Sequence, residues 1–308
     1  MAAKWTAEQI PDQAGRKFIV TGANSGLGLS TCEALAAHDA HVVMACRDLA
    51  KGERARQQVL AGAPEAHVEL APLDLADLSS VAAFAASEQA SGPLDVLINN
   101  AGLMAPPRGE TKDGFELQFG TNHLGHFALT AQLIDRMPAS TDPRVVTVAS
   151  GAHHMGRMSF EDPMAKRHYF RWSQYARSKL ANLLFAFELD RRLRAAGSPI
   201  KSVAAHPGYA ATNLQSAAPP ALDRAVMKVM NPLVAQSADL GALPQLFAAT
   251  APGVNSGDYY GPDGVGEFRG HPRRVGASGA ARNEQDAARL WALSEELTGV
   301  SFAVPAAA

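Results

Sequence analysis

The chain has 308 residues, of which 47% are hydrophobic, so it is long enough to bury a substantial core without disulfide bonds or metal ions. Lysine and arginine total 28 against 30 acidic residues, a balance that disfavours a nucleic-acid partner. Cys32 and Cys46 form no Cys-x-x-Cys pair, the amino terminus lacks a secretory-signal pattern, and no apolar run is long enough to span a bilayer. We therefore expect a soluble cytoplasmic protein.

Short runs rich in strand-forming residues alternate with longer helical patterns. This alternation predicts right-handed βαβ crossovers, and hence an α/β fold with a doubly wound, mostly parallel, Rossmann-like sheet and helices on both faces. No flexible linker interrupts the pattern, so residues 1–308 are expected to form a single domain. The predicted strands are Lys17–Thr21, His41–Ala45, His67–Ala71, Leu94–Asn99, Arg144–Ala149 and Lys201–Ala205.

A glycine-rich turn directly follows the first predicted strand and precedes a segment of helix-forming composition. Glycine permits a sharp turn and a close approach of the backbone to a pyrophosphate, and a helix amino terminus offers unpaired N–H groups to the anion. The sequence therefore predicts a dinucleotide site in a NAD(P)-binding domain. Its residues are Gly22, Asn24, Ser25, Gly26, Leu27 and Gly28.

The end of the second strand bears on which dinucleotide binds. NAD enzymes commonly hold the adenosine ribose with an acid here, whereas a 2′-phosphate is repelled by an acid and attracted by arginine. Cys46 stands at the acid position and Arg47 follows it, so NADP(H) is the preferred cofactor and NAD(H) a possible one. Asp48 is the counterargument, but it is more simply the N-cap of the next helix. The alternative for Arg47 is a solvated surface arginine.

Tyr175 and Lys179 lie four residues apart in the run Tyr-Ala-Arg-Ser-Lys, and one helical turn places the phenol and the ammonium on one face. A phenol titrates near pH ~10, and an adjacent positive charge lowers this pKa by stabilising the phenolate. Such a pair can perform acid–base chemistry, but it also occurs on ordinary solvated helix faces. Tyr169 is a rival phenol that lacks a lysine four residues later.

Residues near other strands supply the context. Ser150 follows the fifth strand and offers a hydroxyl to a substrate oxygen, and Asn122 is a poor helix former in the long helix after the fourth strand. Together with Asn-Asn-Ala-Gly at 99–102 and Pro-Gly-x-x-x-Thr at 207–212, the ordered set resembles the short-chain dehydrogenase/reductase family. Ala-Cys-Arg-Asp and Tyr-x-x-Ser-Lys-Leu-Ala-Asn further resemble its retinol dehydrogenase-like and protochlorophyllide reductase-like branch.

The resemblance implies hydride transfer between NADP(H) and a carbonyl/alcohol substrate of lipophilic or bulky character. Tyr175 is then the acid–base group, Ser150 binds the substrate oxygen, Lys179 lowers the phenol pKa and holds the nicotinamide ribose, and Asn122 distorts its helix to hold a relay water. The further cofactor contacts that it implies are Asp74, Leu75, Asn99, Asn100, Ala101, Gly102, Tyr175, Lys179, Pro207, Gly208 and Thr212. It also implies a homodimer or homotetramer built through the helices that contain Asn122 and Tyr175.

Two other functions stay open from the sequence. A light-dependent pigment reductase of the related branch would reduce a carbon–carbon double bond, and a noncatalytic NADP-sensing or scaffold protein would have no need of Ser150 and Tyr175. No metal is predicted, because the pairs His123/His126 and His153/His154 lack a recognisable ligand set.

Three segments are interpreted from their composition. The interval 150–175 is expected to wall the substrate pocket. The proline-containing stretch 213–235 is expected to form a helical substrate flap. Residues 261–264 and 272–274 read as turns.

Overall fold

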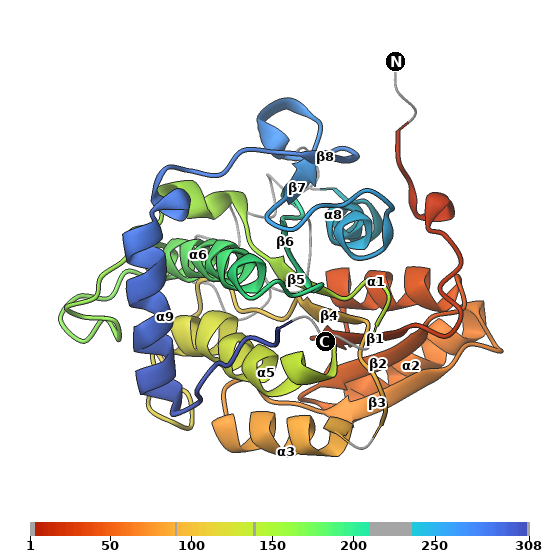
Figure 1. The fold of residues 1–308 in the computed structure, drawn as a ribbon, viewed down its shortest axis with the longest axis horizontal. Helices are drawn as coiled ribbons and strands as arrows, with labels where there is room; N and C mark the ends of the chain where they lie inside the picture. The colour runs from red at the N-terminus through yellow and green to blue at the C-terminus, as the bar shows by residue number, and fades with distance from the viewer. Residues whose placement is uncertain (1–3, 90, 138–139, 210–235, 307–308) are drawn as a thin grey trace.

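An eight-stranded sheet forms the centre of the protein in the computed structural model, with the strand order β3-β2-β1-β4-β5-β6-β7-β8 (Figure 1). Strands β1 to β7 are parallel, and β8 is antiparallel to β7. The predicted doubly wound, mostly parallel α/β fold is thus confirmed. The strands are β1 (Lys17–Thr21), β2 (His41–Cys46), β3 (Val68–Pro72), β4 (Val96–Asn99), β5 (Arg144–Val148), β6 (Lys201–Ala205), β7 (Tyr259–Pro262) and β8 (Pro272–Arg274).

The structure describes residues 4–89, 91–137, 140–209 and 236–306. The substrate flap expected at 213–235 and the cofactor contact expected at Thr212 lie outside these residues. None of the helices that are described is both long and apolar enough to cross a membrane.

The six predicted strands all form, with ends shifted by at most two residues. The interpretation of 261–264 as a turn holds for 263 and 264 only, and that of 272–274 was wrong. Residues 261 and 262 end β7, and residues 272–274 form β8, with Gly261 opposite Arg273 in the register. Proline and glycine hid the strand pattern in both segments. Pro272 is tolerated because it begins a short edge strand, where its missing N–H breaks no ladder.

Helices cover both faces of the sheet (Figure 1). Alternation along β1 divides the core, because Phe18 and Val20 pack into one apolar cluster and Ile19 into the other. One face carries α1 (Gly26–Ala36), α2 (Leu49–Gly62) and α8 (Ala238–Thr250), and the other carries α3 (Leu78–Gln89), α5 (Gly125–Leu133) and α6 (Arg171–Ala195). Helix α9 (Glu284–Thr298) packs outside α6.

The outer side of α5 and α6 is covered within the chain. Trp291 of α9 packs edge-on against Phe127 of α5 and stacks on Phe185 of α6, with ring centroids 5.2 and 5.9 Å apart. The carboxyl-terminal Phe302 contacts the same two phenylalanines. These contacts cover apolar side chains of α5 and α6 within the described chain. The homodimer or homotetramer expected through these helices stays a prediction.

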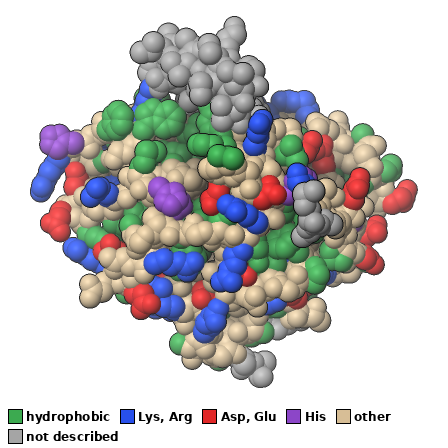
Figure 2. All heavy atoms as spheres, turned by 90° about the horizontal axis from the view of Figure 1, so that it is seen from above, with side chains coloured by type: hydrophobic (Ala, Val, Ile, Leu, Met, Phe, Trp, Pro, Cys, Tyr) green, Lys and Arg blue, Asp and Glu red, His purple; other side chains and the backbone are tan. Residues whose placement is uncertain are grey.

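Basic and acidic side chains are interspersed on the face of the molecule that Figure 2 shows. This mixture agrees with the formal net charge of -2. A nucleic-acid site would instead need a continuous basic patch.

Candidate active site

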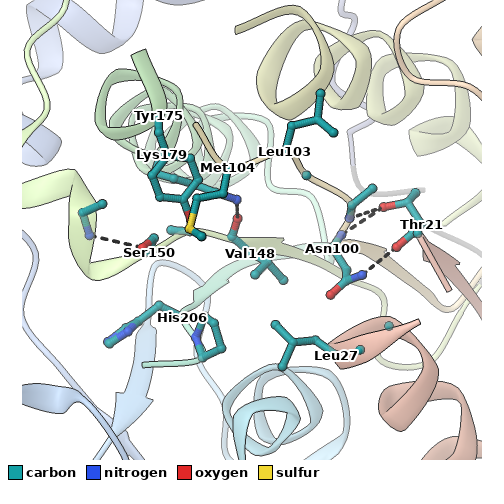
Figure 3. A pocket seen from close by; sticks show the side chains of 18 of the residues that line it. Thr21, Leu27, Asn100, Leu103, Met104, Val148, Ser150, Tyr175, Lys179 and His206 are labelled. Atoms are coloured by element: carbon teal, nitrogen blue, oxygen red, sulfur yellow. Dashed lines mark hydrogen bonds between the residues drawn. The ribbon is translucent and has the colours of Figure 1, made fainter. Parts of the chain in front are cut away.

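A cavity of about 1290 Å³ runs along the carboxyl ends of the parallel strands, where loops from both halves of the sheet meet (Figure 3). Most of the residues that the sequence assigned to the site line this one cavity. They are Gly22, Asn24, Ser25, Gly26, Leu27, Gly28, Arg47, Asp74, Leu75, Asn100, Ala101, Gly102, Ser150, Tyr175, Lys179, Pro207 and Gly208.

The glycine turn has the geometry that a pyrophosphate needs. Gly22 and Gly26 have φ values of 66° and 53°, in the left-handed region that favours glycine. A Cβ at Gly28 would lie 2.4 Å from the carbonyl oxygen of Gly22, so no side chain fits there. Helix α1 begins at Gly26 and leaves its first N–H groups without intrahelical partners, and the side chain of its N-cap, Ser25, makes no capping bond. These donors fit a bound anion.

The end of β2 presents basic side chains to the same cavity. Arg47 is exposed, and Lys51, which the sequence reasoning missed, also lines the cavity one helical turn later. Asp48 caps α2 by accepting from the Lys51 backbone N–H at 3.0 Å, as predicted. Burial raises the pKa of the Cys46 thiol to about 11, so Cys46 places no negative charge beside these cations near neutral pH.

Tyr175 and Lys179 lie on one face of α6 and point into the other end of the cavity (Figure 3). The Lys179 Nζ atom is 5.9 Å from the centre of the phenol ring and donates to the Val148 carbonyl at 3.2 Å. The Ser150 hydroxyl, which follows β5, accepts from the Ala152 N–H at 3.2 Å and lies close enough to the phenol to affect its pKa. Ser150 lies 25 residues before Tyr175 in the sequence, and Lys179 lies one helical turn after it. All three side chains share one wall of the cavity.

Burial governs the protonation of this pair. It raises the pKa of Tyr175, while the nearby Ser150 side chain acts in the opposite direction, and it lowers the pKa of Lys179 to about 8. The resemblance implied a lowered phenol pKa, but the residues of the protein itself raise the pKa of Tyr175. The physical reason is that desolvation dominates and the ammonium is directed at Val148.

Asn122 lies behind the cavity wall, inside the π-helical segment η2 (Gly120–Leu124) that follows the short α4 (Leu117–Phe119). The expected distortion of the helix is thus present. The Asn122 side chain accepts from the Leu103 N–H at 2.7 Å and donates to the Leu103 carbonyl and the Ser178 hydroxyl, both at 2.9 Å. These hydrogen bonds connect the loop after β4 to α6, behind Lys179.

His126 extends this network to the glycine turn. Its Nδ1 donates to the Asn122 carbonyl at 3.0 Å, so its Nε2 accepts from the Thr21 hydroxyl, 2.9 Å away. The Thr21 oxygen in turn accepts from the N–H groups of Asn100 and Ala101. Burial lowers the pKa of His126 to about 4, and this neutral ring has a positioning role that the sequence reasoning missed.

His153 contacts the backbone of Ser150. Its Nδ1 donates to the Ser150 carbonyl at 2.8 Å, and its Nε2 accepts from the Ser278 N–H at 3.2 Å. Of the two remaining histidines in these pairs, His123 bonds Ser294 and His154 lines the cavity. In the interval expected to wall the pocket, His154, Met155 and Trp172 do line it.

Some assignments lie outside the cavity, and some of its walls were not foreseen. Asn99 is fully buried and donates to Thr130 at 2.9 Å, so it supports the wall without reaching the cavity. The unforeseen lining residues lie largely on loops without a motif, where no spacing signals them. They include Leu103, Met104, Thr121, His206, Tyr209, Glu267, Phe268 and Arg273.

One group of potential metal ligands occurs among the described residues, away from the cavity. His41, His67 and Glu69 lie at the amino-terminal ends of β2 and β3, and both imidazoles bond one Glu69 oxygen, at 2.8 and 3.2 Å. The rings are stacked 3.7 Å apart and are nearly parallel. No single ion can lie in both ring planes in this arrangement, so it is an imidazole pair bridged by a carboxylate.

The comparisons with known proteins agree with this geometry. A family model for short chain dehydrogenases matches residues 16–223. Human retinol dehydrogenase 12 is 39% identical over 300 residues, which cover 96% of this chain and 90% of the relative. Mouse polyprenol dehydrogenase is 40% identical over 296 residues, which cover 94% and 86%.

Solved structures show the same fold. The crystal structure of an uncharacterised protein from Mycobacterium paratuberculosis is 45% identical, with a TM-score of 0.82 over 98% of this chain and 100% of that one. A structure described as an NAD(P)-dependent gluconate 5-dehydrogenase from Beutenbergia cavernae, with bound NADP at low occupancy, is 25% identical, with a TM-score of 0.63 over 80% and 95%. The chain therefore belongs to the short-chain dehydrogenase family of oxidoreductases, in its retinol dehydrogenase-like branch.

Proposed function

We propose that this oxidoreductase transfers hydride between NADP(H) and an apolar alcohol or its carbonyl partner, with Tyr175 as the acid–base group. The observation that carries the proposal is the meeting of Ser150, Tyr175 and Lys179 at one end of a cavity whose other end holds the glycine turn. A dinucleotide laid along this cavity has its pyrophosphate at α1 and its nicotinamide beside the phenol.

Each side chain has a distinct task in the proposed reaction. When bound, the nicotinamide supplies hydride to a carbonyl carbon or accepts it from an alcohol. Ser150 and Tyr175 hydrogen-bond the substrate oxygen, and Tyr175 donates a proton to it in reduction or removes one in oxidation. Lys179 holds the nicotinamide ribose and stabilises the phenolate. The Asn122 carbonyl, with one lone pair taken by His126, offers its second lone pair to a relay water.

The preference for NADP(H) rests on charge at the end of β2. Arg47 and Lys51 both line the cavity there, and two cations suit a 2′-phosphate better than a ribose hydroxyl. The neutral Cys46 takes the place of the acid that would hold the two hydroxyls of NAD.

The substrate is proposed to be an apolar alcohol or aldehyde. Met155 and Phe268 line the cavity while 75% and 53% exposed, and Trp172 and Leu103 add further apolar surface. Exposed apolar side chains around a cavity mark a site for an apolar ligand. The relatives named for retinol and polyprenol are dehydrogenases of isoprenoid alcohols, which have this character.

A paired cofactor screen tests the proposal. Retinol, a polyprenol, a short aliphatic alcohol and the matching aldehydes are each assayed with NADP(H) and NAD(H), in the dark and in light. We expect turnover in the dark, NADP(H) favoured at least about tenfold, and the long apolar substrates preferred. Arg47→Ala should remove most of the cofactor preference.

Three outcomes would count against the proposal. A clear preference for NADH would refute the role of Arg47. Turnover that requires light would favour the pigment reductase, and NADPH binding without turnover of any substrate would favour the sensor or scaffold.

A further inference from the structure

A loop from the carboxyl-terminal part of the chain forms part of the wall at the nicotinamide end of the cavity. It connects β7 to β8 and brings Glu267 and Phe268 beside Pro207 and Gly208. This loop lies beyond residues 16–223, the part that matches the family model. The site is therefore completed by a segment that the shared motifs do not include.

His206 joins this loop to the turn at Pro207–Gly208. The imidazole is only 2% exposed and lies across the cavity from Tyr175 and Lys179 (Figure 3). Its Nδ1 accepts from the Gly208 N–H at 3.2 Å, and its Nε2 lies 3.1 Å from Glu267 Oε2. Because Nδ1 is the acceptor, Nε2 bears the proton and donates it to the carboxylate. This hydrogen bond also holds the pKa of Glu267 below its usual value.

The backbones of the turn and the loop are in direct contact. The Tyr209 N–H donates to the Phe268 carbonyl at 2.8 Å. A Cβ at Gly208 would lie 2.4 Å from that same carbonyl oxygen, and Gly208 has a φ of 66°, so only glycine permits the approach. Gln236 bridges the two segments, since it donates to the Pro207 carbonyl and accepts from the Gly270 N–H.

Glu267 itself is held in a costly backbone conformation. Its φ is 58°, in the left-handed region that residues with a Cβ rarely adopt. Such a conformation persists where surrounding contacts fix it. Here the Glu267 side chain bonds His206, and His206 bonds the Pro207–Gly208 turn. The carboxylate is half-buried, and its second oxygen lies 3.9 Å from Arg273.

We propose that Glu267 is a positioning residue that, through His206, fixes the Pro207–Gly208 turn against which the nicotinamide half of the cofactor binds. The inference rests on the proposed function, because it takes NADP(H) as the ligand. The adenosine half binds near Arg47, at the end of β2. Strands β1, β4 and β5 separate β2 from β6, and β7 lies beyond β6. Loss of the Glu267 carboxylate should therefore weaken binding of the nicotinamide half and leave binding of the adenosine half unchanged.

Two ligands separate the two halves. NADPH spans the whole cavity, whereas 2′,5′-ADP has only the adenosine half with its 2′-phosphate. Isothermal titration calorimetry with the full-length protein should show that Glu267→Ala weakens NADPH binding by about tenfold to a hundredfold, the range for loss of a hydrogen bond to a charged group. Binding of 2′,5′-ADP should change less than about twofold.

Matched variants sharpen the result. Glu267→Gln keeps an oxygen acceptor for His206 and should retain most NADPH affinity, whereas Glu267→Asp is one methylene too short and should resemble alanine. Arg47→Ala should weaken both ligands. Glu161→Ala removes an exposed acid whose partner is Arg289 and should weaken neither. A thermal melt of each variant shows whether it is folded, and the aspartate variant replaces alanine if alanine does not fold.

The proposal is overturned if Glu267→Ala and Glu267→Asp leave NADPH binding unchanged, or weaken both ligands equally. If the unmodified protein binds 2′,5′-ADP but not NADPH, the assignment of the nicotinamide end is wrong, and the role proposed for Glu267 is wrong with it. If it binds neither ligand, the NADP-dependent function itself fails.

Discussion

The Tyr175 phenol is buried, lies beside Ser150 in the cavity wall, and has its ring centre 5.9 Å from the Lys179 ammonium. Removing only its hydroxyl should remove proton transfer and leave the ring in place. We expect Tyr175→Phe to lower turnover by about 10² to 10⁴, the usual worth of positioned acid–base catalysis. NADPH affinity, measured by calorimetry, should stay measurable. A phenylalanine variant with most of its activity would refute the assignment.

We expect Lys179 to make the affinity for NADPH depend on pH. Its pKa is lowered to about 8, and an ammonium that donates to ribose hydroxyls is stabilised on binding, so its pKa is higher in the complex. Affinity for NADPH should therefore be constant well below pH 8 and fall as the pH rises through 8 toward the pKa of the bound state.

Calorimetry between about pH 6.5 and about pH 9.5 measures this slope, below the range in which ordinary lysines titrate. Lys179→Met should bind more weakly, with a flat profile across the same range. As a control, 2′,5′-ADP does not reach Lys179 and should bind without the slope. A methionine variant that kept the slope would assign the titration to another group.

Sequence reasoning singled out residues for which a motif gives both the residue type and its place, either at a strand end or on one face of a helix. Ser150, Tyr175 and Lys179 are of this kind. Lys51 was missed as a member of the site because no motif includes it. His126 and Glu267 were missed because their roles depend on partners far away in the chain. His126 reaches Thr21, and Glu267 reaches His206, through contacts that no local spacing encodes.

Among the elements, the π-helical segment η2 supports the site through the Asn122 side chain. Asn122 makes three hydrogen bonds, two to Leu103 and one to Ser178. Asn122→Ala should therefore lower the free energy of unfolding by about 1–3 kcal/mol and loosen the loop at Gly102 beside Lys179. Urea denaturation measures the change.

The matched control is Asn255→Ala, since Asn255 is exposed and should change stability by less than about 0.5 kcal/mol. An Asn122 variant as stable as this control would show that the Leu103 loop is held by other contacts.

Periodicity revealed the six central strands, because buried parallel strands read as continuous runs of β-branched and aliphatic residues. The same reading failed for the β7–β8 hairpin. Its strands are short and rich in proline, glycine and arginine, and β8 is stabilised by pairing with β7 rather than by an apolar pattern. The part of the site that this hairpin contributes was missed for the same reason.

At the scale of the whole molecule, α9 packs on α5 and α6, the helices through which the sequence predicts association with a second subunit. In Figure 1 it runs across α5 and α6, and it is tied to η2 by a hydrogen bond between Ser294 and His123 at 2.8 Å. Arg192 of α6 lies 4.3 Å above the Trp291 ring. We therefore expect the intact chain not to associate through α5 and α6.

Trp291→Ala tests this cover. The ring is 2% exposed and packs against three phenylalanines, so its truncation should cost about 3–5 kcal/mol of folding free energy. It should also expose the apolar side of α5 and α6. Light scattering after size exclusion should give 32.4 kDa for the intact chain and a larger, concentration-dependent mass for the variant. An intact chain of twice that mass, with α6 shielded from hydrogen exchange only at high protein concentration, would contradict the prediction, because it would place the subunit contact where α9 now lies.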